Sequence, residues 1–277
     1  MITSRGCPFR CSFCVSSKNF AHWWRFRSAE KVFEEIKLLY DQYGVRHIYF
    51  QDDEFCVDHK RIKKLADMII ESKMDLIWEC LTRVNHIDED LVKDMARSGC
   101  KSVLYGVEVG YEDGFKKINK PVSLYMTYSA VKLAQKYSIM VKASFIMGFP
   151  WESEKELKQT INFARKLDAD LTFFNTLTPY PGTYLYQEIV DKGLLIGGDD
   201  WEMHATHGTF PLVRTEHLTE KELAYWVGRA YFSMYMRPKY IWRKLKSINN
   251  FQELKRNVKS GVELMVLSAK RVISLDA

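Results

Sequence analysis

Three cysteines lie within the first fourteen residues, in the segment Arg5-Gly6-Cys7-Pro8-Phe9-Arg10-Cys11-Ser12-Phe13-Cys14, and no fourth cysteine follows nearby. A four-iron cluster usually takes four thiolates, so Cys7, Cys11 and Cys14 alone leave one iron open to a substrate. A catalytic zinc likewise keeps one coordination position free, whereas a structural metal is closed by protein ligands. The spacing therefore predicts a catalytic iron–sulfur site. The alternatives are a zinc site completed by His22, and buried cysteines that are unreactive. The absence of paired C-x2-C motifs disfavours zinc.

The other three cysteines, Cys56, Cys80 and Cys100, are scattered through apolar segments. Their spacing supports neither a second cluster nor a disulfide framework, so we interpret them as small buried hydrophobic residues. This use of cysteine predicts a reducing, cytoplasmic environment.

The elements that must position the cysteines follow an alternating pattern. Short β-rich segments are expected at Ile2-Thr3-Ser4, His47 to Gln51, Leu76 to Cys80, Ser102 to Val107, Val141 to Met147 and Leu171 to Asn175. Helical periodicity between them places apolar residues on one face, as in the sets Val32, Ile36, Leu39, Tyr40 and Tyr43; Ile62, Leu65 and Ile69; and Leu157, Ile161 and Ala164. Ser153 with Glu156, and Thr219 with Glu222, have capping-box spacing and predict two helix starts.

Strands that alternate with helices predict an α/β fold with a parallel sheet. Six βα units are too few for an eight-stranded barrel, so we expect a partial (β/α)6 TIM-like barrel with its chemistry at the C-terminal strand ends. The pattern changes at Gly197-Gly198-Asp199-Asp200, before a Trp/His loop and further helices. We therefore predict a partial barrel over residues 1–196, and a loop with a helical C-terminal extension over residues 197–277.

Composition sets broad limits. The 277 residues, 47% hydrophobic and 14% aromatic, are sufficient for a large core and do not suggest disorder. Neither a signal peptide nor a membrane-spanning helix is expected. The net charge of +6 is uneven, because residues 237–271 carry ten Lys or Arg and two Glu. A solvated basic helical tail is favoured over a docking surface for an acidic partner, a membrane face or a nucleic acid, and we expect no nucleic-acid enzyme.

The cysteine motif, with Phe13 just before its last cysteine, resembles the signature of the radical S-adenosylmethionine (SAM) superfamily. The resemblance is greatest to the branch that carries a cobalamin-binding domain, including the anaerobic oxidative cyclases of Mg-protoporphyrin monomethyl ester and cobalamin-dependent methylases. The motifs that carry it are Thr3-Ser4-Arg5-Gly6-Cys7-Pro8, Asp52-Asp53-Glu54-Phe55, Thr82-Arg83-Val84-Asn85, Tyr105-Gly106-Val107-Glu108, Gly148-Phe149-Pro150-Trp151-Glu152 and Pro179-Tyr180-Pro181-Gly182-Thr183. They span about residues 1 to 190.

The resemblance implies partners for each end of SAM. The amino and carboxylate groups of SAM chelate the open iron, and Asp53 or Glu54, with Asp52 beside them, lies where the family keeps an acidic motif for the ammonium. Without the resemblance, a solvated helix cap or a Mg²⁺ site is the alternative for this acidic cluster. Arg83 follows the third strand and can pair with a carboxylate, which arginine does bidentately, and a surface arginine is the alternative. Glu108 lies where this branch accepts hydrogen bonds from the ribose, although Glu108-Val109-Gly110 departs from the usual Glu-Ser-Gly of relatives.

The remaining landmarks implied by the resemblance end the later strands. Ile146 and Gly148 lie where the adenine usually packs, and Glu152 closes that motif one position later than the strict superfamily spacing. A turn of ordinary structural type is the alternative for Ile146 and Gly148. Asn175 and Tyr180 follow the sixth strand, where a structural turn competes with substrate contact. A lid over the open side is expected from Trp201, His204 and His207, for which packing is the alternative.

The resemblance implies an enzyme that uses a 4Fe-4S cluster to cleave SAM to a 5′-deoxyadenosyl radical, for methyl transfer or oxidative cyclisation at an unactivated carbon. The expected partners are a small-molecule substrate that is lipid-like or tetrapyrrole-like, and a one-electron reductant such as flavodoxin or ferredoxin. Relatives place the cobalamin domain before the first barrel strand, where this chain begins, so cobalamin is expected only through a domain outside this chain. The alternative is an iron–sulfur electron-transfer protein or a metal-stabilised binding protein that does not cleave SAM.

Overall fold

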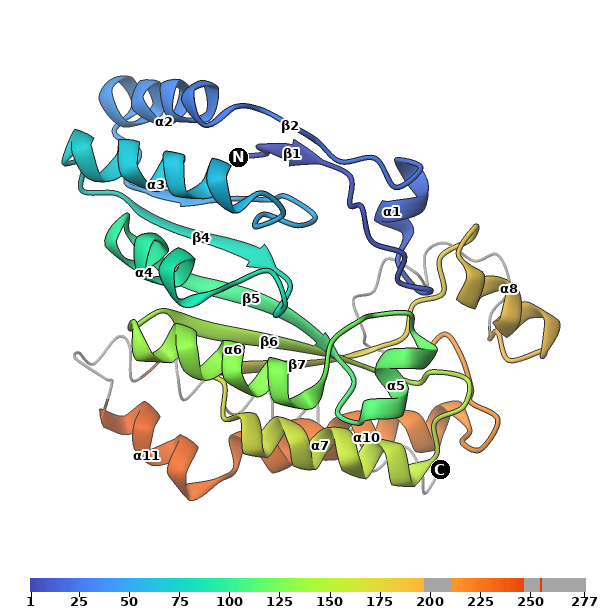
Figure 1. Cartoon of the computed structure of the whole chain (residues 1–277). Helices are drawn as coiled ribbons and strands as arrows, with labels where there is room; N and C mark the ends of the chain where they lie inside the picture. The colour runs from blue at the N-terminus through green and yellow to red at the C-terminus, as the bar shows by residue number, and fades with distance from the viewer. Residues whose placement is uncertain (197–210, 247–254, 256–277) are drawn as a thin grey trace. The chain divides into compact units, whose positions relative to one another are not determined.

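A computed structural model describes residues 1–196, 211–246 and 255 (Figure 1). Its strands are β1 Ser4–Arg5, β2 Arg25–Phe26, β3 His47–Tyr49, β4 Ile77–Thr82, β5 Cys100–Glu108, β6 Met140–Met147 and β7 Leu171–Thr176. Its helices are α1 Val15–Asn19, α2 Ala29–Tyr43, α3 His59–Ser72, α4 Glu89–Arg97, α5 Glu112–Lys117, α6 Leu124–Lys136, α7 Glu154–Leu167, α8 Tyr184–Asp191, α10 Glu220–Tyr235 and α11 Pro238–Lys246. The expected lid residues Trp201, His204 and His207 lie outside the described residues, as does residue 197, so the predicted domain boundary stays a prediction.

The main sheet follows the order of the chain. Within the described residues, five strands hydrogen-bond in the order β3-β4-β5-β6-β7. Strands β3 and β4 are parallel, with Ile48 opposite Trp78, and β4 and β5 are parallel, with Leu81 opposite Leu104. Because helices separate successive strands, each connection is a βα crossover, as a parallel sheet requires. The predicted α/β partial barrel is confirmed.

The first segment differs from a full sixth barrel strand. The Met1 ammonium donates to the Tyr49 carbonyl at 2.8 Å, and the Gln51 amide donates to the Met1 carbonyl at 2.8 Å, so the chain starts beside β3. The amide of Thr3 then donates to the Asp52 side chain at 2.7 Å, where a ladder would need a backbone carbonyl. Strand β1 pairs instead with β2, antiparallel, in a separate two-stranded sheet.

The chain divides into two compact units. The first contains residues 1–107, 112–144 and 169–171. In it α2 packs on α3, α3 on α4 and α4 on α6, so the helices form a row (Figure 1). Its core includes Phe50 stacked on Phe55 at 4.5 Å between ring centroids, with Trp78 edge-on to Phe50 at 5.5 Å. These aromatic contacts hold β3 and β4 and the residues that follow β3.

The second unit contains residues 108–111, 145–168 and 172–277. Within its described part, α7 packs on α10, and α10 on α11. Phe145 stacks on Phe174 at 5.4 Å, and Phe174 meets Tyr231 of α10 edge-on at 5.6 Å. The aromatic contacts therefore join the ends of β6 and β7 to α10.

Most local helix predictions are confirmed. Both capping boxes are present, with the Ser153 and Thr219 hydroxyls accepting backbone amides at the starts of α7 and α10. In α2, Val32 and Ile36 are buried as expected. Tyr43 is wrong as a core residue, because its side chain is 70% exposed at the last position of the helix.

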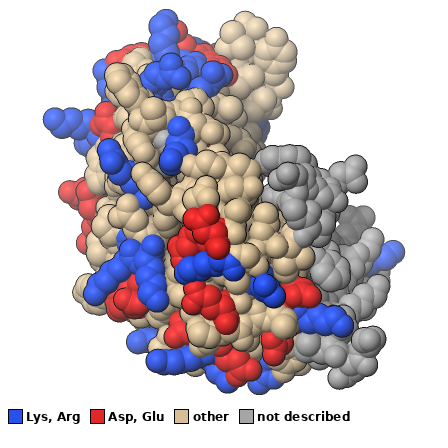
Figure 2. Space-filling model, turned by 90° about the vertical axis from the view of Figure 1, so that its right-hand side faces the viewer, with Lys and Arg blue, Asp and Glu red and all other residues tan. Residues whose placement is uncertain are grey.

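No described helix has both the length and the apolar run that a membrane crossing requires. On the face drawn in Figure 2, acidic and basic side chains are interspersed. Such mixing is usual for a solvated surface.

Candidate active site

The three-cysteine loop runs from β1 to α1. Cys7, Cys11 and Cys14 are half-buried free thiols, and Cys14 is the N-cap residue of α1. The loop backbone is tied to a distant segment, because the Ser12 amide donates to the Ile118 carbonyl at 3.0 Å and the Asn119 side chain donates to the Arg10 carbonyl at 2.8 Å. Burial raises the pKa of Cys7 to about 12, and the charges of Glu54, Cys14 and Cys11 add to that effect. The three sulfur atoms are thus close enough to interact electrostatically.

Gly6 sets the path of the loop. Its φ is +85°, and a Cβ added there would lie 2.1 Å from the backbone oxygen of Trp23. A side chain at this position would therefore clash with backbone as well as strain the dihedral angle. The Gly6 amide donates to Asp53 Oδ2 at 3.2 Å.

Two of the three acidic residues after β3 hold the N-terminal segment. Asp53 Oδ1 accepts from the Ser16 hydroxyl at 2.8 Å, so both of its oxygens bind the cysteine loop and the start of α1. Asp52 accepts from the Thr3 amide and from the Ser4 hydroxyl at 2.6 Å, with Arg61 at 3.9 Å. Both side-chain oxygens of Asp53 are therefore engaged by the protein.

Glu54 is 1% exposed and only half satisfied. Its Oε1 accepts from the Thr82 hydroxyl at 2.5 Å, and its Oε2 has no hydrogen-bond partner among the described residues. Burial raises the pKa of this carboxyl to about 7, although the Thr82 hydrogen bond, the charges of Arg83 and Lys120 and, most weakly, the backbone amide of Cys56 oppose the rise. An unpaired buried carboxylate oxygen is costly, which indicates an acceptor prepared for a ligand.

Arg83 reaches the cysteine loop from the residue after β4. Its Nη1 donates to Cys11 Sγ at 3.2 Å, and its Nε donates to Asn85 Oδ1 at 3.2 Å. The guanidinium carbon lies 4.1 Å from the centre of the Phe9 ring, a cation–π contact that fixes its plane. The buried Nη2 has no hydrogen-bond partner in the described part of the chain. The site thus holds an unpaired donor as well as an unpaired acceptor.

Lys120 is a site residue that the sequence reasoning missed. It is 4% exposed, its Nζ donates to the Gly106 carbonyl at 2.6 Å, and its charge lowers the pKa of Glu54. In the sequence it is the last lysine of Lys116-Lys117-Ile118-Asn119-Lys120, which runs from the end of α5 into the following loop, where a solvated side chain is the usual outcome. Only its burial reveals it.

The residues present fit an iron–sulfur cluster better than a single ion. Three free thiols share one short loop, Arg83 contacts Cys11 of that loop, and Glu54 interacts electrostatically with Cys7 and Arg83. No group of three Cys, His, Asp or Glu side chains in the described ranges converges as ligands of one metal ion. His22 Nδ1 lies 3.2 Å from the Phe9 carbonyl. The zinc alternative with His22 as fourth ligand therefore gains no support from the geometry.

In the second unit, the predicted site residues lie at strand ends. Glu108 is the last residue of β5, is buried, and has a φ of +71°, a left-handed conformation that is unusual for glutamate. Ile146 is half-buried near the end of β6, and Gly148 follows that strand with a φ of +103°. A Cβ at Gly148 would lie 2.6 Å from Leu223 Cδ2. The Glu108 conformation is of the kind that accumulates at functional sites, whereas a positive φ is ordinary for a glycine.

Glu152 holds the turn after β6. Its Oε2 accepts from the amides of Gly148 at 2.7 Å and Phe149 at 3.1 Å, and its Oε1 accepts from the Tyr111 hydroxyl at 3.0 Å. Burial raises the pKa of Glu152 to about 7, against the opposing effect of these hydrogen bonds. Trp151 donates to the same Tyr111 hydroxyl at 3.0 Å. Glu152 thus positions the backbone of the predicted adenine-binding turn.

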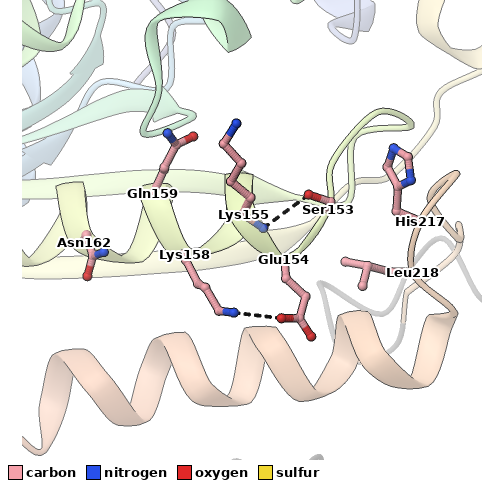
Figure 3. A pocket seen from close by; sticks show the side chains of 8 residues that line it. All are labelled: Ser153, Glu154, Lys155, Lys158, Gln159, Asn162, His217 and Leu218. Atoms are coloured by element: carbon pink, nitrogen blue, oxygen red, sulfur yellow. Dashed lines mark hydrogen bonds and ion pairs between the residues drawn. The ribbon is translucent and has the colours of Figure 1, made fainter.

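A pocket of about 580 Å³ in the second unit is a separate feature (Figure 3). Residues of α7 line one side, and His217 and Leu218 line the other. Lys158 pairs with Glu154 at 2.8 Å within it. None of the predicted site residues contributes to its lining.

An α/β partial barrel whose first loop carries three free cysteines defines the class of protein. The model of the Radical SAM superfamily matches residues 1–164, and the chain belongs to this superfamily. The resemblance inferred from the motifs is confirmed.

Two curated relatives and one solved structure are informative. An uncharacterised methyltransferase of Pyrococcus horikoshii is 36% identical over 251 residues, which cover 91% of this chain and 54% of the relative. The anaerobic magnesium-protoporphyrin IX monomethyl ester cyclase of Rubrivivax gelatinosus is 31% identical over 191 residues, 68% of this chain and 34% of the relative. The fold matches that of the cobalamin-dependent SAM radical enzyme OxsB, whose structure was solved with aqua-cobalamin and SAM bound. The TM-score is 0.71 and the sequence identity is 16%, and the match covers 97% of this chain and 46% of OxsB. The chain spans about half the length of these proteins, or less.

Proposed function

We propose that this chain is the catalytic barrel of a radical SAM methyltransferase. Cys7, Cys11 and Cys14 would hold a 4Fe-4S cluster, and three thiolates for four irons would leave one iron open to the amino-acid end of SAM. When bound and reduced, the cluster supplies the electron that cleaves the sulfonium of SAM. Membership of the superfamily and the three free thiols of one loop support this assignment.

The observation that carries the proposal is the pair of unpartnered atoms in the first unit. Among the described residues, buried Glu54 Oε2 lacks a donor and buried Arg83 Nη2 lacks an acceptor. The amino-acid end of SAM bears N–H donors on its amino group and acceptor oxygens on its carboxylate, so one ligand offers a partner for each atom. We assign Glu54 to the N–H groups of the amino group and Arg83 to the carboxylate. A charge-assisted hydrogen bond to each group would orient SAM in a site from which water is excluded.

Other residues of the first unit prepare this site. Lys120 and Arg83 stabilise the ionised form of Glu54, which is the form that accepts a hydrogen bond from an ammonium. The contact of Arg83 with Cys11 Sγ links the SAM-binding group to the cluster loop. Phe13 is half-buried between the second and third cysteines, and we assign it to shielding the cluster from water.

For the adenosine of SAM, the family resemblance supports roles for three residues of the second unit. Glu108 accepts from the ribose hydroxyls, and Ile146 with the backbone of Gly148 contacts the adenine. Glu152 acts through that turn as a positioning residue, because it binds the amides of Gly148 and Phe149.

Methyl transfer is favoured as the reaction because the methyltransferase of P. horikoshii matches 91% of this chain at 36% identity. Oxidative cyclisation is the second candidate, supported by the cyclase at 31% identity. The same cyclase supports a tetrapyrrole-like small molecule as the substrate class. We assign cobalamin to a domain outside this chain, and electron delivery to a small reductant such as flavodoxin or ferredoxin.

The test is anaerobic reconstitution with iron and sulfide, followed by dithionite and SAM, with products identified by mass spectrometry. The wild type is expected to bind about four irons and to form 5′-deoxyadenosine. Cys11→Ala should lose both, whereas Cys100→Ala, at a buried core position, should lose neither. Addition of hydroxocobalamin with formation of S-adenosylhomocysteine would favour methyl transfer over cyclisation. A stable cluster that neither binds nor cleaves SAM would instead identify an electron-transfer protein.

The assignment of Glu54 and Arg83 needs its own measurement. Glu54→Gln and Arg83→Gln should each weaken SAM binding to the reconstituted protein by about tenfold to a hundredfold, the usual effect of removing one charge-assisted hydrogen bond. Arg97→Gln, which changes an exposed arginine of α4, is the matched control. Equal SAM affinity in all four proteins would contradict the assignment.

A further inference from the structure

Helix α11 presents apolar side chains to solvent. Trp242 is 62% exposed, Leu245 is 53% exposed and Ile241 is 42% exposed. At 100° per residue, these three positions lie on one side of the helix. Their contiguity distinguishes them from the isolated exposed apolar residues that are common on protein surfaces.

The opposite side of α11 fixes which face is exposed. Tyr240 packs edge-on against Tyr235 of α10 with 4.8 Å between ring centroids. Asp168, at the C-terminal end of α7, binds Lys239 at 2.7 Å, Arg237 at 3.4 Å and Arg243 at 3.7 Å. These contacts tie α11 to the second unit, so the apolar side cannot simply rotate inward.

The charge around the apolar side has one sign. The sequence of α11, PKYIWRKLK, contains four basic residues and no acidic residue. Asp168 is one carboxylate facing three cations, so the local charge stays positive after pairing. The Lys246 ammonium lies 5.2 Å from the centre of the Trp242 ring, directly beside the exposed apolar side. The sequence from residue 237 to 271 continues the bias, with ten Lys or Arg and two Glu.

We propose that the side of α11 formed by Ile241, Trp242 and Leu245 binds the surface of an anionic lipid bilayer. An apolar stripe flanked by lysines, with a tryptophan within it, is the pattern of a helix that lies in the membrane interface. Trp prefers the headgroup level because its ring is apolar and its indole N–H is polar. Lysines beside the stripe are attracted by the negative surface potential of acidic headgroups.

Charge complementarity selects lipid over a second copy of the chain. A symmetric dimer through this side would place the same basic residues of two helices close together, and like charges oppose such an interface. An anionic bilayer supplies both an apolar layer for the stripe and counter-charges for the lysines. The inference is independent of the proposed function, since it uses no residue of the cysteine loop or of the SAM site.

The experiment is flotation of the full chain with vesicles of phosphatidylcholine alone, or with about 30 mol% phosphatidylglycerol. The wild type should bind the anionic vesicles, bind neutral vesicles at least about tenfold more weakly, and dissociate at about 0.5 M NaCl. The double variant Trp242→Ser/Leu245→Ser should reduce the partition coefficient by about tenfold or more. Lys246→Glu should reduce the partition coefficient by about tenfold, because the substitution removes an attractive charge and adds a repulsive one.

The matched control is Tyr125→Ser/Met126→Ser, which removes an exposed apolar pair of α6, 78% and 41% exposed. It should bind vesicles as the wild type does. Circular dichroism and the melting temperature verify that each variant is folded. The proposal is overturned if the wild type does not bind anionic vesicles, if neutral vesicles bind equally well, or if the α11 variants bind unchanged. It is also overturned if light scattering shows a wild-type dimer that Trp242→Ser converts to a monomer while vesicle binding is absent.

Discussion

The buried carboxyl of Glu152 should make the stability of this chain depend on pH in a way that one substitution removes. Glu152 is fully buried, and its pKa rises from the ordinary 4.5 to about 7 because burial disfavours the charged form. Below pH 4.5 the group is protonated in both the folded and the unfolded chain and contributes no pH-dependent penalty. Between pH 4.5 and 7 the unfolded chain loses the proton first, so folding becomes less favourable as the pH rises.

The magnitude follows from the two pKa values. At about 1.4 kcal/mol for each tenfold change in proton affinity, ionising Glu152 in the folded chain costs about 3 kcal/mol above pH 7. About 2.5 kcal/mol of that loss falls between pH 5 and 8. Glu152→Gln is uncharged throughout this range, and its carboxamide oxygen can still accept the amides of Gly148 and Phe149. The variant should therefore lack this part of the pH dependence.

The assay is urea unfolding of the cluster-free wild type and Glu152→Gln under reducing conditions, at several pH values from 5 to 8. The wild type should lose about 2.5 kcal/mol relative to the variant across that range. Glu156→Gln is the control, because hydrogen bonds from Ser153 lower the pKa of Glu156 from its ordinary 4.5 against the effect of its burial, so its titration falls below the assay range and its stability difference from the wild type should stay nearly constant from pH 5 to 8. A stability difference between wild type and Glu152→Gln that stays constant within about 1 kcal/mol would refute the reasoning.

Three further predictions concern the scaffold of the site. Gly6→Ala should abolish cluster incorporation, measured as bound iron, because the added Cβ would lie 2.1 Å from a backbone oxygen. Gly44→Ala is the control, because Gly44 has a φ of +67° but open space around it. This variant should lose only about 1 kcal/mol of folding stability and should retain iron. Arg61→Met should destabilise the chain by about 3–5 kcal/mol in urea unfolding, because it leaves buried Asp52 without its cation. A loss below about 1 kcal/mol would show that the hydroxyl and amide donors alone stabilise the buried Asp52 carboxylate. Thr219→Ala should cost about 1 kcal/mol by removing the capping box of α10, and an unchanged urea midpoint would contradict that role.

Some features of this protein were determined by sequence alone, because they depend on neighbours in the chain. The spacing of Cys7, Cys11 and Cys14 identified the loop that we propose as the cluster-binding loop. Short β-rich segments located the strands, helical periodicity located the helices, and Ser153 with Glu156 marked the start of α7. Each of these signals depends on residues that are close together in the sequence, so it can be recognised without knowing the rest of the fold.

Only the tertiary structure determined which charged groups of the candidate site are hydrogen-bonded by the protein and which keep an unpaired atom. The sequence presents Asp53 and Glu54 as equivalent neighbours, and the fold engages both oxygens of Asp53 with the cysteine loop while leaving Glu54 Oε2 unpaired. Lys120 and the contact between Arg83 and Cys11 arise between segments far apart in the chain. Burial and long-range hydrogen bonds exist only after the chain has folded, and they, rather than residue type, determine which charged group is held by the protein and which is left to bind a ligand.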